Sequence, residues 1–365
     1  MLREPELQAS AITSVVGVFP VDMGLPVDAS TGGTTPGMAT DVTVMVDGQD
    51  TGVRGGVSDR QVAVPLKPLF GLLGCRLTWQ AAEKKAVLQR GSRSLALYPG
   101  KDRGWAGDHE VWVNPPPRLA GGRLVVPLKA VAENLGCGMK WDPQASTLDL
   151  RPWPEPAVRV VTRRIREESE KLKVDIQYPE VSGLGPSVDA AINEPLKGWA
   201  LEALAGGRRA VENAAQAPEA PQQSEVVADY RVALNQDSLL SIVLTNYTYV
   251  AGAAHGLTVQ TSDTFDLRTG RMYALRDLFQ PGVDYIALLT EEVKRQIRER
   301  GLEESLLRPF ESVEPTQKWY LTGDSLVLYY DQYEYWPYAW GIQEFPIALT
   351  GLRDVLAPPF SLLAK

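Results

Sequence analysis

The sequence predicts an α+β protein of two domains, and three observations lead to this prediction. The segment Val64–Leu88 recurs without a gap as Val126–Leu150, with 9 of 25 positions identical. Prolines at alternate positions within 152–157 separate this repeat from the rest of the chain. Strand-like alternation and helix-like apolar stripes occur on both sides of these prolines. We therefore expect a duplicated strand–helix–strand module with a pseudo-twofold repeat, and then an antiparallel sheet packed with two helices.

The two copies of the repeat share three short motifs. Each begins with Val-Pro-Leu-Lys, continues through Leu-Gly-Cys and reaches a tryptophan, Trp79 in the first copy and Trp141 in the second. A gapless internal match of this kind indicates a duplicated structural unit. One copy is too small to bury its apolar face, so we expect the two copies to share one core that contains both tryptophans.

The elements of the first domain follow from alternation, proline and glycine. Proline at the first turn and glycine just after the last turn predict helices over Pro65–Leu73 and Pro127–Leu135. The glycines between Gly52 and Gly56 predict a loop. We expect strands over Asp41–Asp47, Arg60–Val64, Arg76–Trp79, Lys85–Arg90, Arg93–Leu97, Trp105–Val113, Arg123–Val126, Gly138–Trp141 and Thr147–Leu150.

The second domain has two amphipathic stretches. Apolar residues at helical spacing predict helices over Ser187–Leu204, which contains Pro195, and over Asp284–Arg300. We expect strands over Val158–Glu167, Lys171–Tyr178, Val226–Leu234, Ser238–Val250, Leu257–Asp266, Trp319–Leu321, Ser325–Tyr330 and Glu344–Ala348.

These elements divide the chain into five segments. They are a leader at 1–40, the duplicated domain at 41–151, a proline-rich linker at 152–157, the second domain at 158–356 and a tail at 357–365. The leader contains an apolar stretch, Ala11–Pro20, with the length of a signal-peptide core, but Glu4 and Glu6 precede it where basic residues are usual. A degenerate export signal and a plain cytosolic tail are both consistent with this composition.

Charge and residue content exclude several classes of protein. The formal net charge is 37 minus 45, or -8, which argues against a nucleic-acid partner. No stretch reaches the ~20 apolar residues of a membrane span. Two histidines and two cysteines, Cys75 and Cys137, cannot form a familiar zinc site, so we predict no metal and no cofactor. The two cysteines are either free core thiols or a disulfide.

The repeat resembles a known domain. Its Val-Pro-Leu-Lys and Leu-Gly-Cys motifs, followed by Trp141–Leu148, are similar to the copper amine oxidase N-terminal-like (stalk) domain over residues 41–151. That family is common on Gram-positive surface and secreted proteins and is treated as an adhesive or spacer module. The oxidase itself binds copper through three histidines, and this chain has two in total. The resemblance therefore implies a stalk without the oxidase.

The second half contains a further set of characteristic segments, in this order: Tyr178–Leu184, Tyr249–Gly256, Phe265–Gly270, Leu275–Phe279 and Tyr333–Gly341. Through these segments residues 158–356 resemble the extracytoplasmic region, of DUF4163 plus DUF3298 type, shared by the anti-sigma factor RsiV and the non-catalytic part of some peptidoglycan deacetylases. In RsiV-like relatives this region recognises lysozyme, so the resemblance implies a recognition domain.

The candidate ligand-binding residues lie in two of these segments. His255 stands between Ala254 and Gly256 at an expected turn, where small neighbours allow close approach. Exposed aromatic side chains are usual anchors of protein and glycan recognition. The alternative is that these rings belong to the core and that His255 is a structural histidine bonded to a nearby backbone group or carboxylate. The predicted ligand-binding residues are Tyr249, His255, Tyr333, Tyr335, Trp336, Tyr338 and Trp340.

The sequence favours a non-enzymatic, extracytoplasmic cell-envelope protein that is secreted or attached to the surface. In this interpretation the stalk presents a recognition domain to a protein, such as a lysozyme, or to a cell-wall glycan. No catalytic residue is assigned. A first alternative is a cell-wall glycan or peptide hydrolase that uses His255 with Asp331 or Glu334, and a second is a structural spacer without a ligand. The sequence leaves the oligomeric state open and permits a homodimer.

Overall fold

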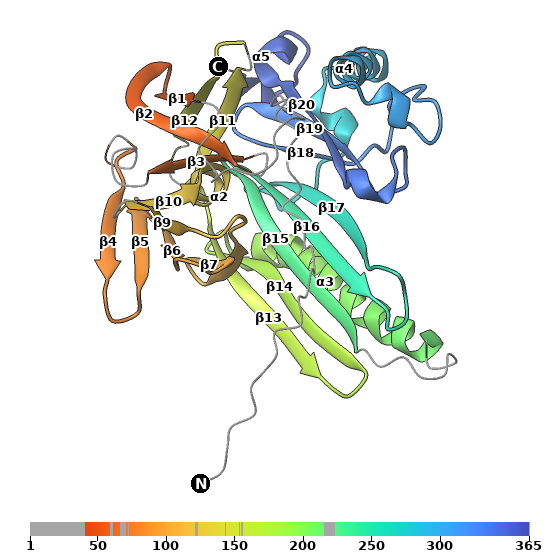
Figure 1. Ribbon diagram of the computed structural model, residues 1–365. Coiled ribbons are helices and arrows are strands. Elements are labelled where there is room, and N and C mark those ends of the chain that lie inside the picture. The colour runs from red at the N-terminus through yellow and green to blue at the C-terminus, as the bar shows by residue number, and fades with distance from the viewer. Residues whose placement is uncertain are drawn as a thin grey trace.

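The structure is a computed structural model that describes residues 41–58, 61–65, 71, 73–120, 123–142, 144–152, 154, 156–214 and 223–364 (Figure 1). The expected leader at 1–40 lies outside these residues, as does most of the first expected helix, Pro65–Leu73. No helix within the described ranges is both long enough and apolar enough to cross a membrane.

The N-terminal part contains a seven-stranded sheet. Its order is β11-β12-β1-β2-β3-β10-β9, and only the β1–β12 pair is parallel. The strands are β1 (Asp41–Val46), β2 (Gln49–Ser58), β3 (Gln61–Pro65), β9 (Arg118–Ala120), β10 (Arg123–Pro127), β11 (Cys137–Asp142) and β12 (Thr147–Pro152). The prediction of a loop between Gly52 and Gly56 is wrong, because these residues lie within β2. Gly55 packs so tightly there that a Cβ would meet Val62 at 2.8 Å.

A second sheet of five antiparallel strands follows the chain order. Its strands are β4 (Arg76–Gln80), β5 (Lys85–Arg90), β6 (Arg93–Leu97), β7 (Arg103–Ala106) and β8 (His109–Trp112). The single strand expected over Trp105–Val113 is two strands, because Gly107 and Asp108 form a turn between β7 and β8. The helix α2 (Leu128–Asn134) confirms the second expected helix and buries Leu128, Val131 and Ala132 in the shared core.

The two copies of the repeat take different sheet partners. β3 and β10 pair with each other, and Val64 stands opposite its repeat equivalent Val126. Beyond that contact β11 and β12 join the seven-stranded sheet, whereas β4 and β5 join the five-stranded sheet. The expectation that both repeated tryptophans are buried is wrong for Trp79, which is 48% exposed, while Trp141 packs partly buried against the core. The internal pseudo-twofold stays a prediction.

The C-terminal part begins with a five-stranded sheet of order β13-β14-β15-β16-β17. The helix α3 (Pro186–Ala214) connects β14 to β15, so these two strands are parallel, and the expected purely antiparallel sheet is wrong at this pair. Parallel neighbours need such a crossover connection. The strands are β13 (Arg159–Glu168), β14 (Leu172–Ser182), β15 (Ser224–Gln236), β16 (Leu239–Tyr249) and β17 (Leu257–Asp266).

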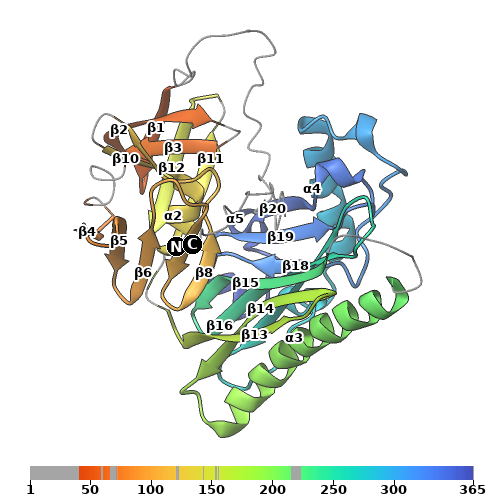
Figure 2. The same cartoon turned by 60° about the horizontal axis from the view of Figure 1, so that its bottom comes forward.

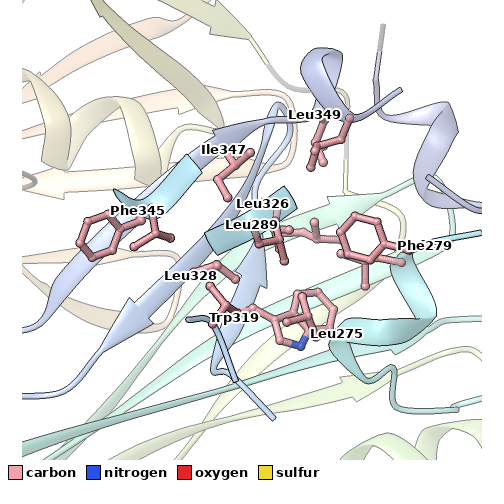
Figure 3. Close-up of a cluster of buried hydrophobic side chains, with 14 of the residues drawn as sticks. Leu275, Phe279, Leu289, Trp319, Leu326, Leu328, Phe345, Ile347 and Leu349 are labelled. Atoms are coloured by element: carbon pink, nitrogen blue, oxygen red, sulfur yellow. The ribbon is translucent and has the colours of Figure 1, made fainter. Parts of the chain in front are cut away.

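The remaining strands form a separate sheet, β18 (Trp319–Leu321), β19 (Ser325–Tyr330) and β20 (Gln343–Ala348). The helix α4 (Tyr285–Glu299) confirms the amphipathic expectation, with Asp284 accepting from the Ala287 amide at its N-terminus. Its apolar stripe and the short helix α5 (Leu349–Leu352) pack against this sheet. Figure 3 shows the resulting core, including Leu289, Leu326, Phe345 and Leu349.

The β13–β17 sheet is the centre of the molecule. Ile192 and Leu196 of α3 pack on the face that carries Ile242 and Leu244. Ala233 and Val243, on the other face, pack with Tyr320 and Val327 of the β18–β20 sheet. Figure 2 shows α3 on one side of the sheet, with the N-terminal part and the β18–β20 sheet on the other. The central sheet therefore contributes to two interfaces.

Both cysteines are free in this structure. Cys137 is completely buried in the N-terminal core, and this burial raises the pKa of its thiol to about 11 from 9.0. The structure therefore agrees with the core-thiol alternative, in which each cysteine is a small apolar residue.

Cys137 makes the stability of the protein depend on pH above 9. The unfolded chain ionises this thiol near pH 9, whereas the folded chain holds the proton until about pH 11. The free energy of unfolding should therefore fall by roughly 2 kcal/mol as the pH rises through this window. Urea unfolding at pH 8 and pH 11 measures this loss.

The matched control is Cys137→Ala, which keeps every tyrosine and lysine that titrates in the same range. This variant is expected to lose less stability between the two pH values than the native protein. An identical loss in both proteins would contradict the assignment to Cys137.

Candidate functional site

The first candidate site is an aromatic cluster of His255, Tyr333 and Tyr338. The turn before β17 supplies His255, and the loop after β19 supplies the two tyrosines. The His255 ring stacks on Tyr338 with 4.0 Å between ring centroids, and the Tyr333 ring lies 5.9 Å from that of Tyr338. His255 and Tyr333 are exposed and Tyr338 is half-buried. The structure thus brings together three of the predicted residues across 83 positions of sequence, from 255 to 338.

Hydrogen bonds fix the orientation of the His255 ring. Its Nδ1 lies 2.9 Å from the Gly256 carbonyl oxygen, and its Nε2 lies 3.2 Å from the Tyr333 hydroxyl. A carbonyl oxygen only accepts, so Nδ1 carries a proton and donates. In the neutral ring Nε2 then accepts from Tyr333. These two hydrogen bonds hold the imidazole in the orientation in which it stacks on Tyr338.

Local packing holds the turn and the loop together. A Cβ on Gly256 would lie 2.3 Å from the Tyr247 ring, so a larger residue would have to displace that ring. Gln332 is buried, and its side-chain oxygen accepts from the Thr258 amide at 3.2 Å, which ties the loop to β17. Tyr333 adopts a positive φ of 66°, a conformation that is uncommon outside glycine. These contacts position the aromatic cluster.

The prediction that Tyr335 and Trp336 are exposed anchors for a ligand is wrong, because both side chains are buried. Trp336 is completely buried, and its indole donates to the Leu302 carbonyl at 3.2 Å. Tyr335 is buried against Phe310 and Tyr330. The loop folds back, so these rings belong to the hydrophobic core beside the β18–β20 sheet, as the alternative for this segment held.

The other two predicted residues lie near the aromatic cluster in sequence. Trp340, 39% exposed, belongs to the short 3-10 helix η3 (Tyr338–Trp340) that also carries Tyr338. Tyr249 is half-buried at the end of β16. Of the seven predicted residues, His255, Tyr333 and Trp340 are therefore exposed, and Tyr249 and Tyr338 are half-buried.

The acidic residues of the loop serve its structure. Asp331 forms an ion pair with Lys318, and Glu334 accepts from the Asp331 amide at 2.9 Å. Within the described part of the chain no carboxylate contacts His255, and the Gly256 carbonyl and the Tyr333 hydroxyl occupy its two ring nitrogens. The residues proposed for the hydrolase alternative are thus not assembled as an acid–base pair. The described residues also contain no group of three metal-ligating side chains.

A second candidate site was not predicted. A cleft of about 820 Å³ lies where the N-terminal part, the β13–β17 sheet and β20 meet. Its floor consists of residues in register on neighbouring strands, with Asp229 opposite Thr245, Thr245 opposite Gln260, and Arg231 opposite Val243. Strand alternation places these five side chains on the face away from α3. Sequence reasoning missed them because each is an ordinary polar or apolar residue of a strand.

The hairpin of β7 and β8 forms one wall of this cleft. His109 pairs with Asp229 and stacks on Tyr230 with 4.2 Å between ring centroids. Gln177 binds the backbone of Glu110 twice, because its side-chain oxygen accepts from the amide at 3.1 Å and its nitrogen donates to the carbonyl at 3.0 Å. These contacts join the two halves of the chain.

A further part of the lining carries charge of both signs. α2 contributes Lys129 and Glu133, and β20 contributes Glu344. Burial alone would lower the pKa of Arg231 on the floor, but Tyr320, Glu133 and Glu344 nearby raise it above its ordinary value. Arg231 is therefore a firmly charged guanidinium inside the cleft.

Comparison with known families adds to this geometry. Residues 45–150 match the copper amine oxidase N-terminal domain. Residues 165–258 match the family described as deacetylase PdaC, and residues 276–350 match DUF3298, a family of unknown function. The order agrees with the expected one, although PdaC stands where DUF4163 was expected. The copper amine oxidase match is confined to that enzyme's N-terminal domain.

The chain is similar to one curated protein and to solved structures. It is 25% identical over 151 residues to the peptidoglycan-N-acetylmuramic acid deacetylase PdaC of Bacillus subtilis (strain 168). That match covers 39% of this chain and 32% of the relative, so the chain spans about a third of its length.

Two crystal structures of DUF3298 family proteins each cover 57% of this chain. The first, from Bacteroides fragilis NCTC 9343, is 19% identical, with 98% of its own chain covered and a TM-score of 0.43. The second, from Pseudomonas aeruginosa PAO1, is 18% identical, with 97% covered and a TM-score of 0.41.

The two tryptophans of the loop should respond differently to truncation. Trp336→Ala removes a completely buried ring and should lower the free energy of unfolding by about 3–5 kcal/mol. Trp340→Ala truncates an exposed ring and should cost less than about 1 kcal/mol. Urea unfolding of both variants checks the difference, and equal costs would contradict the placement of Trp336 in the core.

Proposed function

We propose that this chain is a non-enzymatic, extracytoplasmic cell-envelope protein that binds a protein or a cell-wall glycan. The observation that carries this proposal is the exposed aromatic cluster, in which His255 stacks on Tyr338 and hydrogen-bonds Tyr333. Stacked rings with polar edges favour the faces of sugar rings and of peptide side chains. A lysozyme and peptidoglycan are the two ligands that this proposal names.

The comparisons support the cell envelope as the location. The PdaC relative is named for peptidoglycan, and the PdaC family match includes His255 of the aromatic cluster. The net charge of -8 is also consistent with a partner other than nucleic acid.

The proposed architecture is a stalk that carries a recognition domain. The stalk is the segment 41–151, in which we propose a pseudo-twofold between the two copies; the pairing of Val64 with its repeat equivalent Val126 supports this. The linker at 152–157 leads to the recognition domain at 158–356. Dimerisation of the chain is compatible with this arrangement.

A second candidate function is deacetylation of a cell-wall glycan. The 25% identity to a peptidoglycan deacetylase favours it. Release of acetate from peptidoglycan by the native chain would support this candidate, and binding without release supports the first proposal.

The aromatic cluster should control binding to purified peptidoglycan or to lysozyme. The double variant Tyr333→Ala/Trp340→Ala removes two exposed rings and should weaken co-sedimentation or pull-down at least 10-fold. Binding of the full chain to each target is measured before and after the change.

The matched control is Trp79→Ala, which removes another exposed tryptophan, from β4 in the N-terminal part. It should bind as the native chain does. Unchanged binding in the double variant would contradict the proposed surface. Failure of the native chain to bind either target would leave the structural-spacer alternative.

A further inference from the structure

The floor of the cleft holds two polar side chains with unused bonding capacity. Gln260 is only 6% exposed, and its side-chain nitrogen makes no hydrogen bond to any described residue. Arg231 hydrogen-bonds Tyr320, and its guanidinium carbon lies 4.9 Å from the centre of that ring. A buried donor without an acceptor is unfavourable, and this applies to the Gln260 nitrogen. A guanidinium has five N–H donors, so Arg231 can also donate to an acceptor brought by a ligand.

The charges around the cleft balance. Four cationic residues line it (Arg93, Lys129, Arg159 and Arg231), and so do four carboxylates (Asp108, Glu133, Asp229 and Glu344), which gives 4 minus 4, or zero, with His109 left out of the count. A ligand with a net charge gains little from such a lining. A ligand that carries both signs at separate ends can use both.

The four carboxylates of the cleft differ in the hydrogen bonds and ion pairs that they make with other residues of the chain. His109 pairs with Asp229, and Thr162 donates to Asp108 from its amide and its hydroxyl at 3.1 Å. Glu133 forms an ion pair with Lys129 at 3.9 Å, and the Glu344 carboxylate accepts from the Tyr320 hydroxyl at 3.0 Å. Glu133 and Glu344 are therefore the acids best able to receive a further cation, and both lie on the wall near Arg231.

We propose that this cleft binds a zwitterionic ligand of the amino-acid or short-peptide class. The ligand carboxylate pairs with the Arg231 guanidinium, a carbonyl oxygen accepts from the Gln260 side-chain nitrogen, and the ammonium group lies against Glu133 and Glu344. A volume of about 820 Å³ is within the range of small-ligand sites. The site uses no residue of the aromatic cluster, so it goes beyond the function proposed above.

Titration calorimetry on the full chain tests the proposal with three probes. Alanyl-alanine carries both charges, its N-acetyl derivative lacks the cation, and its C-terminal amide lacks the anion. The native chain should bind alanyl-alanine, and each blocked form should bind at least 10-fold more weakly. Absence of alanyl-alanine binding, or equal affinity for all three probes, would overturn the proposal.

Two variants assign the roles of the residues. Arg231→Gln should abolish the preference for alanyl-alanine over its amide while keeping the preference over the N-acetyl form. Gln260→Leu should weaken the binding of alanyl-alanine at least fivefold. A native-like preference in Arg231→Gln, or native affinity in Gln260→Leu, would overturn the assignment.

Folding and site identity are controlled separately. Thermal unfolding verifies that each variant is folded. If Arg231→Gln does not fold, the affinities of the three probes for the native chain and for Gln260→Leu still test the proposed site. Trp340→Ala, which alters the surface beside the aromatic cluster, should bind alanyl-alanine as the native chain does. Loss of binding in Trp340→Ala would place the ligand at the aromatic cluster and overturn the proposal.

Discussion

The structure depends on where the ladder between β14 and β15 ends. These parallel strands pair from Leu172 opposite Ser224 to Ile176 opposite Ala228, and no further. The next residue of each strand, Gln177 and Asp229, turns its side chain to the β7–β8 hairpin instead. The hairpin therefore satisfies polar groups beside the end of a sheet. Because the two halves of the chain meet there, the face of the sheet away from α3 becomes the floor of a cleft.

The second constraint is the division of the aromatic residues between core and surface. Residues 329–340 contain seven large rings, and the structure buries Tyr329, Tyr330, Tyr335 and Trp336. The buried rings fix the loop against α4 and the β18–β20 sheet, and this holds Tyr338 and Tyr333 beside His255. The geometry of the aromatic cluster therefore depends on the buried rings of the same loop, which are not accessible to a ligand.

The sequence predicted local structure better than assembly. Alternation located most strands, and α4 follows from its apolar stripe, because both signals lie within a few residues of one another. The cleft depends on contacts such as His109 with Asp229, which are 120 positions apart, and no local pattern encodes such a pair. The burial of Tyr335 and Trp336 was not predicted, since loop composition does not say which rings turn inward. The position of His255 between two strands was predicted because its small neighbours mark a tight turn.

We infer that contacts between the β7–β8 hairpin and the central sheet stabilise the fold and hold the two halves together as one cleft. A double-mutant cycle across His109 and Asp229 tests it most directly, with His109→Ala, Asp229→Ala and the double variant measured by urea unfolding. A docked pair predicts a coupling free energy of roughly 0.5–3 kcal/mol. A coupling of zero would show that the two halves unfold without mutual support and would contradict the account.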